Sequence, residues 1–450
     1  MEVSLPKGTR DFLPEQALKR KYIFDSIEAV FQRYGYAPIE TPAFENLSTL
    51  TGKYGEEGDA LLFKVLNNGD FLEKVDAGLL ASKNSQKLVN HIAKRGLRYD
   101  LTVPFARFVV MHQHEVHFPF KRYQIQPVWR ADRPQKGRYQ EFFQCDADVI
   151  GSDALMYEAE LILIYDQIFT ALGLPVDIKI NHRKILLGIA EAAGIADRFT
   201  DMTVAIDKLD KVGVTGVLKE MVMRGIPEGN ASMVLELTAA TEAQLHEALV
   251  LSPTGLTGLQ ELATVRTYLA GQSLKNSLSL DLTLARGLNY YTGCILEVKA
   301  QHVQMGSLGG GGRYADLTGA FGLKNLSGVG ISLGAERIFD VMEDQQLFPA
   351  GLTRRVEVIF IAFDAHTHLF AFDWVQKVRA AGLAADIYPT PEKFKKQMKY
   401  ADDIAAPYVA IVGPDEMLAG EVTLKNMHSG DQKRVNLTQL LSIISQTDAK

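Results

Sequence analysis

Residues 121–151 constrain the fold of this chain more than any other stretch of its sequence. Two apolar runs, KRYQIQPVWR and EFFQCDADVIG, flank a polar loop, ADRPQKGRYQ, that contains proline and glycine. Such a loop between two strand-like runs predicts a pair of antiparallel strands joined by a long hairpin loop. We therefore expect a domain whose central sheet contains antiparallel strands.

The rest of the chain divides into segments of different periodicity. Residues 15–34 have the apolar spacing of a helix, whereas Glu57 to Asp70 contains an Asn-Gly turn and predicts a hairpin. From 183 to 277 the sequence is largely amphipathic helix without obvious chemistry, and we interpret it as an insertion. Residues 281–340 return to strands, a glycine run and a closing helix.

A composition shift at QQLFPAGLTRR, residues 345–355, indicates a linker. Beyond it, short apolar strands alternate with helices, which predicts a small α/β domain around a central sheet. The expected domains are 1–182 and 278–345 for the two parts of a main core, 183–277 for the insertion, and 355–450 for the small domain.

Bulk properties exclude several classes of protein. At 450 residues the chain is longer than one hydrophobic core usually serves, so two or three domains are expected. Its net charge of −6 argues against a protein that coats nucleic acid non-specifically. The only cysteines, Cys145 and Cys294, exclude a disulfide framework and a cysteine-rich zinc site. No apolar run is long enough to span a membrane, and the N-terminus lacks a signal peptide's apolar core, so we expect a cytoplasmic protein with no membrane partner.

The hairpin loop gathers positive charge. Arg130, Arg133, Lys136 and Arg138 fall within nine positions. Guanidinium groups pair with phosphate or carboxylate oxygens, and flanking strands can hold them rigidly. A solvated hairpin tip without any specific role is an equally good interpretation of an isolated loop of this kind.

A second cationic segment, ARGLNYYTG, runs from Ala285 to Gly293. Strand-like runs lie on both sides of it, so its two glycines are consistent with an ordinary bend. The alternative is that Arg286, Tyr290 and Tyr291 line a pocket for an anionic or aromatic ligand. The stretch alone favours the ordinary bend.

Three other motifs do not match the known phosphate-binding, dinucleotide-binding or zinc-binding patterns. SLGGGGRY, residues 307–314, is not a phosphate-binding P-loop, because no Gly-Lys-Ser/Thr follows it, and GVGISLGAERI, residues 328–338, lacks the dinucleotide spacing. The spacing in HQHEVH, residues 112–117, is not that of a zinc protease, so we expect no metal held by protein side chains. What remains is a small-residue strand that runs into a helix with Arg337 in its first turns.

Taken together and in order, nine segments resemble blocks of the histidyl-tRNA synthetases, a family of class II aminoacyl-tRNA synthetases. They span residues 6–340, and the small domain after residue 355 resembles the family's anticodon-binding domain. The resemblance implies an α+β fold: a class II antiparallel sheet core with flanking helices and a helical insertion, followed by a small α/β anticodon-binding domain. The nine segments are PKGTRDFLP, PIETPAFE, LRYDLTVPFAR, RPQKGRYQEFFQCDADVIG, INHRKIL, IDKLDK, ARGLNYYTG, GGGGRYADL and GVGISLGAERI.

The resemblance also implies a two-step reaction. Histidine is activated with ATP to histidyl-adenylate and pyrophosphate, and the histidyl group is then transferred to the 3′ end of tRNA(His). Because charge builds on the phosphoryl oxygens, catalysis depends mainly on positioning and positive charge, and Mg2+ is expected on the ATP. By resemblance, the catalytic and ATP-binding residues are Arg130 and Arg286 at the α-phosphate, Arg337 toward the γ-phosphate, and Arg138 and Glu141 near the nucleotide.

Substrate choice follows, by the same resemblance, from complementary polarity. The ammonium group of histidine needs acceptors, and the two imidazole nitrogens can be distinguished by a carboxylate and a phenol. Asn289 stands where the family signature usually has aspartate. The expected histidine-binding residues are Asp100, Thr102, Gln144, Asp148 and one or both of Tyr290 and Tyr291, and Arg133 and Gln135 match positions near the tRNA acceptor end.

One alternative shares the fold but not the activity: a non-catalytic synthetase paralogue that regulates histidine biosynthesis. Such paralogues usually lack the catalytic arginines and the C-terminal domain, and this chain retains both. The prediction is therefore a histidine–tRNA ligase with L-histidine, ATP and tRNA(His) as partners. By family analogy we also expect a homodimer, with the segment around Pro38 to Glu45 at the subunit interface.

Overall fold

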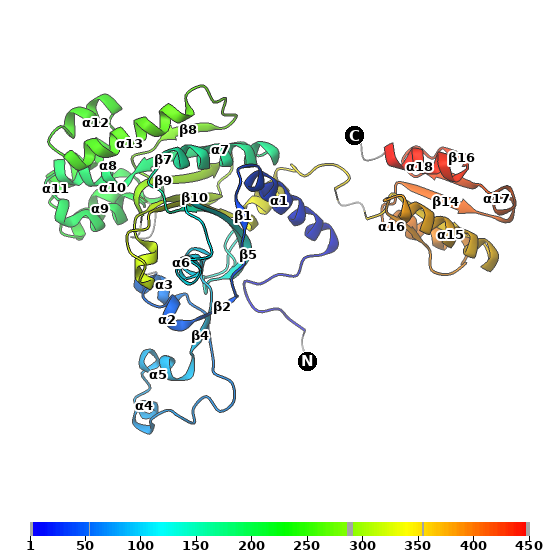
Figure 1. The fold of residues 1–450 in the computed structure, drawn as a ribbon, viewed down its shortest axis with the longest axis horizontal. Helices are drawn as coiled ribbons and strands as arrows, with labels where there is room; N and C mark the ends of the chain where they lie inside the picture. The colour runs from blue at the N-terminus through cyan, green and yellow to red at the C-terminus, as the bar shows by residue number, and fades with distance from the viewer. Residues whose placement is uncertain (1–2, 54, 286–290, 353–354, 447–450) are drawn as a thin grey trace. The chain divides into compact units, whose positions relative to one another are not determined.

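The computed structural model describes residues 3–53, 55–285, 291–352 and 355–446 of the chain (Figure 1). It divides into two compact units, Met1–Phe348 and Pro349–Lys450. The predicted domain bounds at 182, 277 and 345 subdivide the first unit further and stay predictions. Among the described residues, no helix is long and apolar enough to cross a membrane.

An eight-stranded sheet is the centre of the first unit, with strand order β1-β5-β6-β11-β10-β9-β7-β8. The five inner ladders, from β5–β6 to β9–β7, are antiparallel, and only the two edge pairs β1–β5 and β7–β8 are parallel. The expected antiparallel core is thereby confirmed. The strands are β1 (Ala37–Pro38), β5 (Phe120–Trp129), β6 (Glu141–Ile150), β7 (Val176–His182), β8 (Ser277–Leu280), β9 (Tyr291–Ala300), β10 (Gly309–Tyr314) and β11 (Gly328–Gly334).

The hairpin predicted from the sequence is the pair β5 and β6. Their register runs from Phe120 opposite Ile150 to Trp129 opposite Glu141, and the polar loop joins them. Side chains alternate between the two faces of a strand, so the residues of β6 separate into two sets. One set, which includes Cys145 and Ala147, belongs to the hydrophobic core. The other set includes the polar residues Gln144, Asp146 and Asp148 and faces away from that core.

Three helices cover the apolar face of the sheet (Figure 1). They contribute apolar side chains such as Ile27, Ile162 and Ile338, all fully buried, to the same core as the sheet. The polar face is thereby left for a site, with the shorter helix α6 (Thr102–Met111) beside it. The covering helices are α1 (Pro14–Arg33), α7 (Met156–Ala171) and α14 (Ala335–Asp344).

The segment interpreted as an insertion holds six α-helices and one 3₁₀ turn. Its first helix, α8, places Ile185, Leu186 and Ile189 in the same continuous core as the sheet. Close packing of α8 against α13 requires glycine, because a Cβ on Gly188 would lie 2.6 Å from the Cα of Gly255. The helices are α8 (Arg183–Ala192), η1 (Ala196–Arg198), α9 (Phe199–Ile206), α10 (Leu209–Met223), α11 (Glu228–Thr238), α12 (Glu242–Ala248) and α13 (Pro253–Leu269).

The hairpin predicted for Glu57 to Asp70 is wrong. This region contains a short helix and a two-residue strand, β3, which pairs with the distant strand β4 rather than across the Asn-Gly turn. The partner of β3 is thus set by tertiary contacts that a local turn signal does not report. The elements here are β2 (Phe44–Asn46), α2 (Leu47–Leu50), α3 (Gly55–Ala60), β3 (Lys64–Val65), α4 (Ala77–Ala81), α5 (Ser85–Ile92) and β4 (Arg95–Leu97), and η2 (Leu317–Phe321) lies between β10 and β11 in the chain.

The second unit is the expected small α/β domain. Its five-stranded sheet has the order β13-β12-β14-β15-β16, in which β13, β12 and β14 are parallel and the last two strands are antiparallel. Buried apolar side chains cover both faces of the sheet. Its elements are β12 (Val358–Ala362), α15 (Ala365–Ala380), β13 (Ala385–Ile387), α16 (Phe394–Asp403), β14 (Tyr408–Val412), α17 (Pro414–Ala419), β15 (Val422–Asn426), β16 (Gln432–Val435) and α18 (Leu437–Ser445).

Candidate functional site

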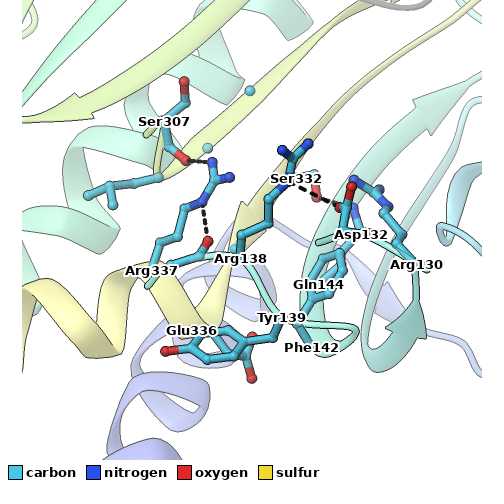
Figure 2. A pocket seen from close by; sticks show the side chains of 15 residues that line it. Arg130, Asp132, Arg138, Tyr139, Phe142, Gln144, Ser307, Ser332, Glu336 and Arg337 are labelled. Carbon is cyan, nitrogen blue, oxygen red and sulfur yellow. Dashed lines mark hydrogen bonds and ion pairs between the residues drawn. The ribbon is translucent and has the colours of Figure 1, made fainter. Parts of the chain in front are cut away.

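A cavity of about 330 Å³ opens on the polar face of the large sheet (Figure 2). Its walls come from the β5–β6 loop, from β6, β10 and β11, and from the first turn of α14. Segments that are far apart in the sequence therefore meet here. The side chains labelled in Figure 2 are Arg130, Asp132, Arg138, Tyr139, Phe142, Gln144, Ser307, Ser332, Glu336 and Arg337.

The guanidinium group of Arg130 is held by a hydrogen bond and by two aromatic rings. Its Nε donates to the carbonyl oxygen of Tyr99 at 3.0 Å, and its guanidinium lies over two aromatic rings, 4.2 Å from the centroid of Tyr99 and 5.1 Å from that of Phe142. None of these partners is an anion. The full positive charge of Arg130 is therefore available to a ligand in the cavity.

Arg337 and Arg138 supply two further charges from other elements. Arg337 donates from Nε to the carbonyl oxygen of Gly137 at 2.8 Å and from Nη1 to that of Ser307 at 2.7 Å, and these two bonds fix its direction (Figure 2). Arg138 lies 3.2 Å from Asp132, and half of its side chain is exposed. Three guanidinium groups thus face one cavity, an arrangement that suits a polyanion.

The two carboxylates of the cavity offset this charge only in part. Glu336 lies 2.7 Å from Arg20 and accepts a hydrogen bond from the backbone of Phe143 at 2.9 Å, so its charge is already paired behind the cavity wall. Burial raises the pKa of Glu336, and Arg20 opposes that rise. Among the described lining residues, Asp132 is the other carboxylate, 3.2 Å from Arg138.

A second, smaller hollow adjoins the first and shares Gly310 and Ser332 with it. Its volume of about 20 Å³ is room for one water molecule, so an amino-acid ligand requires the lining side chains to move. The lining is polar and aromatic. It consists of Thr102, Asp146, Asp148, Tyr291, Gly310, Tyr314, Gly330, Ile331 and Ser332.

Asp148 is the best-supported polar group of the hollow. It is buried and lies 2.6 Å from Arg122, and its other oxygen accepts a hydrogen bond from the hydroxyl of Tyr314 at 3.0 Å. Burial raises the pKa of Asp148, while Arg122 and Tyr314 oppose that rise. Gly330 on the neighbouring strand leaves space for this carboxylate, because a Cβ there would lie 1.9 Å from the Asp148 oxygen.

Gln144, Asp100 and Thr102 approach the same region. Gln144 donates from Nε2 to Ser332 at 2.8 Å, and its amide oxygen is buried without a hydrogen-bond partner among the described residues. Asp100 accepts from the backbone of Val103 at 3.1 Å and so caps the start of α6, whose first residue, Thr102, lines the hollow. Asp100 itself is buried outside both linings.

Several predicted site residues are not brought to this region. Glu141 is exposed, belongs to the opposite alternation set of β6 and accepts a hydrogen bond from Trp129 at 2.8 Å. Arg133 and Gln135 lie in the exposed hairpin loop, outside both linings. Arg286, Asn289 and Tyr290 lie outside the described residues.

Other residues at the site were not predicted from the sequence, most clearly Tyr314, Ser332 and Arg122. Strand alternation could have found them. Tyr314 stands opposite Tyr291 in the β9–β10 ladder, and Ser332 stands opposite Asp146 in the β6–β11 ladder. The register between strands far apart in the sequence was the missing information.

The donor set does not favour a metal held by the protein. Across the described ranges, no group of three or more His, Cys, Asp or Glu side chains is arranged to hold a metal ion.

Comparison with known proteins agrees with this architecture. Residues 8–338 match the family described as Histidyl-tRNA synthetase, and residues 356–447 match the family described as Anticodon binding domain. The chain is 52% identical over 446 residues to a histidine–tRNA ligase of Phocaeicola vulgatus and 53% identical over 448 residues to one of Bacteroides fragilis. These matches cover 98% of this chain and 98–99% of the relatives.

Solved structures give the same answer at the level of the fold. The crystal structure of histidyl-tRNA synthetase from Nostoc sp. PCC 7120 superposes with a TM-score of 0.84 at 29% identity, over 99% of this chain and 100% of that one. An ATP phosphoribosyltransferase regulatory subunit/histidyl-tRNA synthetase from Bacillus halodurans C has a TM-score of 0.70 at 21% identity, over 92% of this chain and 99% of that one, a likeness of fold alone. On the family match and on relatives that are half identical over nearly their full length, this chain belongs to the histidyl-tRNA synthetase family.

Proposed function

We propose that the arginine-lined cavity binds ATP and that the adjoining hollow binds histidine while histidyl-adenylate is formed. Family membership makes the chain a histidine–tRNA ligase, an ATP-dependent enzyme, rather than the regulatory paralogue. The observation that carries the assignment of the two sites is the convergence of Arg130, Arg138 and Arg337 beside a hollow that contains Asp148.

In the cavity, the three guanidinium groups bind the phosphates of ATP. Arg130, whose guanidinium lies over the ring of Phe142 on β6, acts at the α-phosphate, and Arg337 acts at the β- and γ-phosphates. Both are fixed by carbonyl oxygens, so they are already oriented when charge develops on the phosphoryl oxygens. Mg2+ supplies additional positive charge as part of the bound nucleotide.

In the hollow, complementary polarity selects histidine. Asp148 accepts a hydrogen bond from one imidazole nitrogen, and a phenol, Tyr314 or Tyr291, faces the other. The ammonium group lies toward Thr102 and the unpartnered amide oxygen of Gln144. Because the hollow and the cavity share Gly310 and Ser332, the histidine carboxylate is directed at the α-phosphate. Attack there forms the phosphoanhydride bond of the adenylate and releases pyrophosphate.

Transfer to tRNA uses surfaces outside the two pockets. Arg133 and Gln135, exposed in the hairpin loop, contact the acceptor end. In the second unit, Phe363 and Phe394 stack with their ring planes 5° apart and remain 51% and 42% exposed. Exposed aromatic faces stack on unpaired bases, and the lysines beside Phe394 attract the phosphate backbone. We assign this pair to the anticodon loop.

A homodimer is the proposed assembly. The segment Pro38–Glu45 ends at a cavity of about 270 Å³ that exposes 50% of Phe44 and 65% of Met111. In the lining of the same cavity, Arg107 pairs with the buried Glu45 at 2.7 Å. An interface between subunits typically covers exposed apolar side chains such as Phe44 and Met111.

ATP–pyrophosphate exchange with each of the twenty amino acids tests the proposal. We expect exchange with histidine alone, and we expect Arg130→Ala to abolish it while the protein stays folded. Exchange that is absent for every amino acid, or unaffected by Arg130→Ala, contradicts the assignment of the cavity.

A further inference from the structure

Asp146 is an acidic residue that neither the adenylation chemistry above nor the family-matched positions use. It lies in the middle of the polar set of β6, two residues from Gln144 and two from Asp148. The side chain is only 2% exposed and lines the small hollow. Its Oδ1 atom is buried and has no hydrogen-bond partner among the described residues.

The surroundings of Asp146 carry an excess of negative charge. Among the described residues, one guanidinium, that of Arg122, faces three carboxylates, those of Asp100, Asp146 and Asp148, and Arg122 lies 2.6 Å from Asp148. Burial raises the pKa of Asp146 to about 7, Arg122 and a hydrogen bond with Ser332 oppose the rise, and Asp148 and Asp100 add to it. Within the part of the chain that the structure describes, the titratable groups that face Asp146 are Arg122 from β5, Asp148 from β6, Asp100 before α6, Tyr291 from β9, Tyr314 from β10 and Tyr165 from α7.

A purely structural role does not account for this side chain. A buried carboxylate is normally retained where its oxygens accept hydrogen bonds or meet a cation. Ser332 on β11 hydrogen-bonds this carboxylate, yet neither Ser332 nor Gln124 on β5, its two cross-strand neighbours, satisfies Oδ1. In this position asparagine would fill the same volume without the cost of burying a charge. The carboxylate is useful only if a cation enters the hollow.

We propose that Asp146 is a further histidine-binding residue, whose free oxygen accepts a hydrogen bond from the α-ammonium group of the substrate. The inference rests on the proposed function, which places histidine in this hollow. The ammonium is the group of histidine that carries a full positive charge at neutral pH, and Asp146 lies beside Gln144, on the ammonium side of Asp148. Binding below pH 7 then releases one proton from the Asp146 carboxyl group to solvent.

The consequence is a pH-dependent affinity. Above pH 7 the carboxylate is already ionised, and binding costs no proton release. As the pH falls below about 7, Asp146 becomes protonated in the free enzyme and the affinity for histidine decreases. The substrate imidazole also titrates near this range, so the contribution of Asp146 is the difference between the wild-type and variant pH profiles.

Asp146→Asn tests the proposal in the full-length protein, with Asp25→Asn on the exposed face of α1 as the matched amide substitution. Histidine-dependent pyrophosphate exchange is measured from pH 6 to pH 8. A hydrogen bond to a charged group contributes enough that its loss raises KM about 10- to 100-fold at pH 8, and kcat stays within about twofold. The variant loses the wild-type weakening below pH 7, whereas Asp25→Asn behaves as wild type.

Two substrate analogues separate positioning from general damage. Histidinol keeps the ammonium group. We therefore expect its inhibition constant to rise in Asp146→Asn by about the same factor as KM for histidine. Imidazolepropionate lacks the ammonium group, and its inhibition constant does not change. An unchanged KM at pH 8, an unchanged pH profile, or an equal loss for both analogues overturns the inference. Absence of histidine-dependent exchange in the wild-type protein instead overturns the proposed function.

Discussion

At the scale of single residues, the site depends on positions where a small side chain makes room for a charged one. Gly330 is the clearest case, because its missing Cβ is the space that the Asp148 carboxylate occupies. Arg122 and Tyr314 then hold that carboxylate in one orientation. A glycine on β11 and an aspartate on β6 therefore form one functional unit.

Gly330→Ala tests this dependence. The new Cβ lies 1.9 Å from the Asp148 oxygen, so the carboxylate must move, and we expect KM for histidine to rise about tenfold or more with a loss of stability. Gly229→Ala is the control, since nothing lies within 4 Å of its Cβ in α11 and alanine favours a helix. Pyrophosphate exchange and thermal unfolding are the measurements. Equal behaviour of the two variants would show that Asp148 does not need this space.

Asp146→Asn predicts an effect on stability opposite in sign to its effect on binding. The pKa of Asp146 is raised to about 7 in the folded protein, so the stability that favours the protonated acid is fully present below pH 4 and is lost as the pH rises to 7. Asparagine at position 146 does not ionise, so the variant does not lose this stability as the pH rises. In the absence of histidine we expect the free energy of unfolding of the variant at pH 8 to exceed that of wild type by about 4 kcal/mol at most, with a higher unfolding temperature, and the difference to narrow toward pH 5. A wild-type protein that is more stable than the variant at pH 8 contradicts the account.

Site residues were predictable from the sequence only where they belong to a recognisable sequence motif. Gln144 and Asp148 lie on one strand and Arg130 lies in the loop that precedes it, so a single hairpin segment places them together. Tyr314 and Ser332 belong to strands whose neighbours come from other parts of the chain, and their contribution depends on register. Period-two alternation gives the face of each residue, but not the strand that will lie beside it.

At the scale of secondary-structure elements, the β5–β6 hairpin does most to organise the molecule. Its loop supplies Arg130 and Arg138 to the cavity, and its second strand supplies the polar floor. The loop is held to the rest of the site by Arg337, which donates to the carbonyl oxygen of Gly137. The hairpin was predictable because both strands and the turn are local in sequence. The β3–β4 pairing was not, because its strands are two and three residues long.

The aromatic pair of the second unit gives a prediction at this scale. Phe363 follows β12 and Phe394 begins α16, so the pair stands at the carboxyl end of the parallel strands, where α/β sheets bind ligands. Substitution of both by alanine should raise KM for tRNA(His) about tenfold or more, because base stacking contributes about 1–3 kcal/mol per base. Aminoacylation is the assay. Leu418→Ala, an exposed residue on α17, is the control, and equal KM values for both proteins would rule out the stacking role.

At the scale of the whole molecule, activation and tRNA recognition belong to units with separate hydrophobic cores. Every described residue that lines the cavity and the hollow lies in the first unit. A chain that ends at residue 348 should therefore retain pyrophosphate exchange within a few-fold of the intact protein and lose most of its aminoacylation at low tRNA concentration. Loss of exchange from a folded truncated protein would show that the second unit completes the activation site.

The central claim is that two neighbouring pockets hold different substrates, and a pair of KM measurements in pyrophosphate exchange tests it most directly. Arg337→Ala should raise KM for ATP at least tenfold and leave KM for histidine within about twofold, because its charge faces the phosphate cavity. Asp148→Asn should do the reverse, because its carboxylate faces the hollow. The assignment of the two pockets is contradicted if both variants raise both KM values equally. It is also contradicted if Arg337→Ala raises mainly KM for histidine and Asp148→Asn raises mainly KM for ATP.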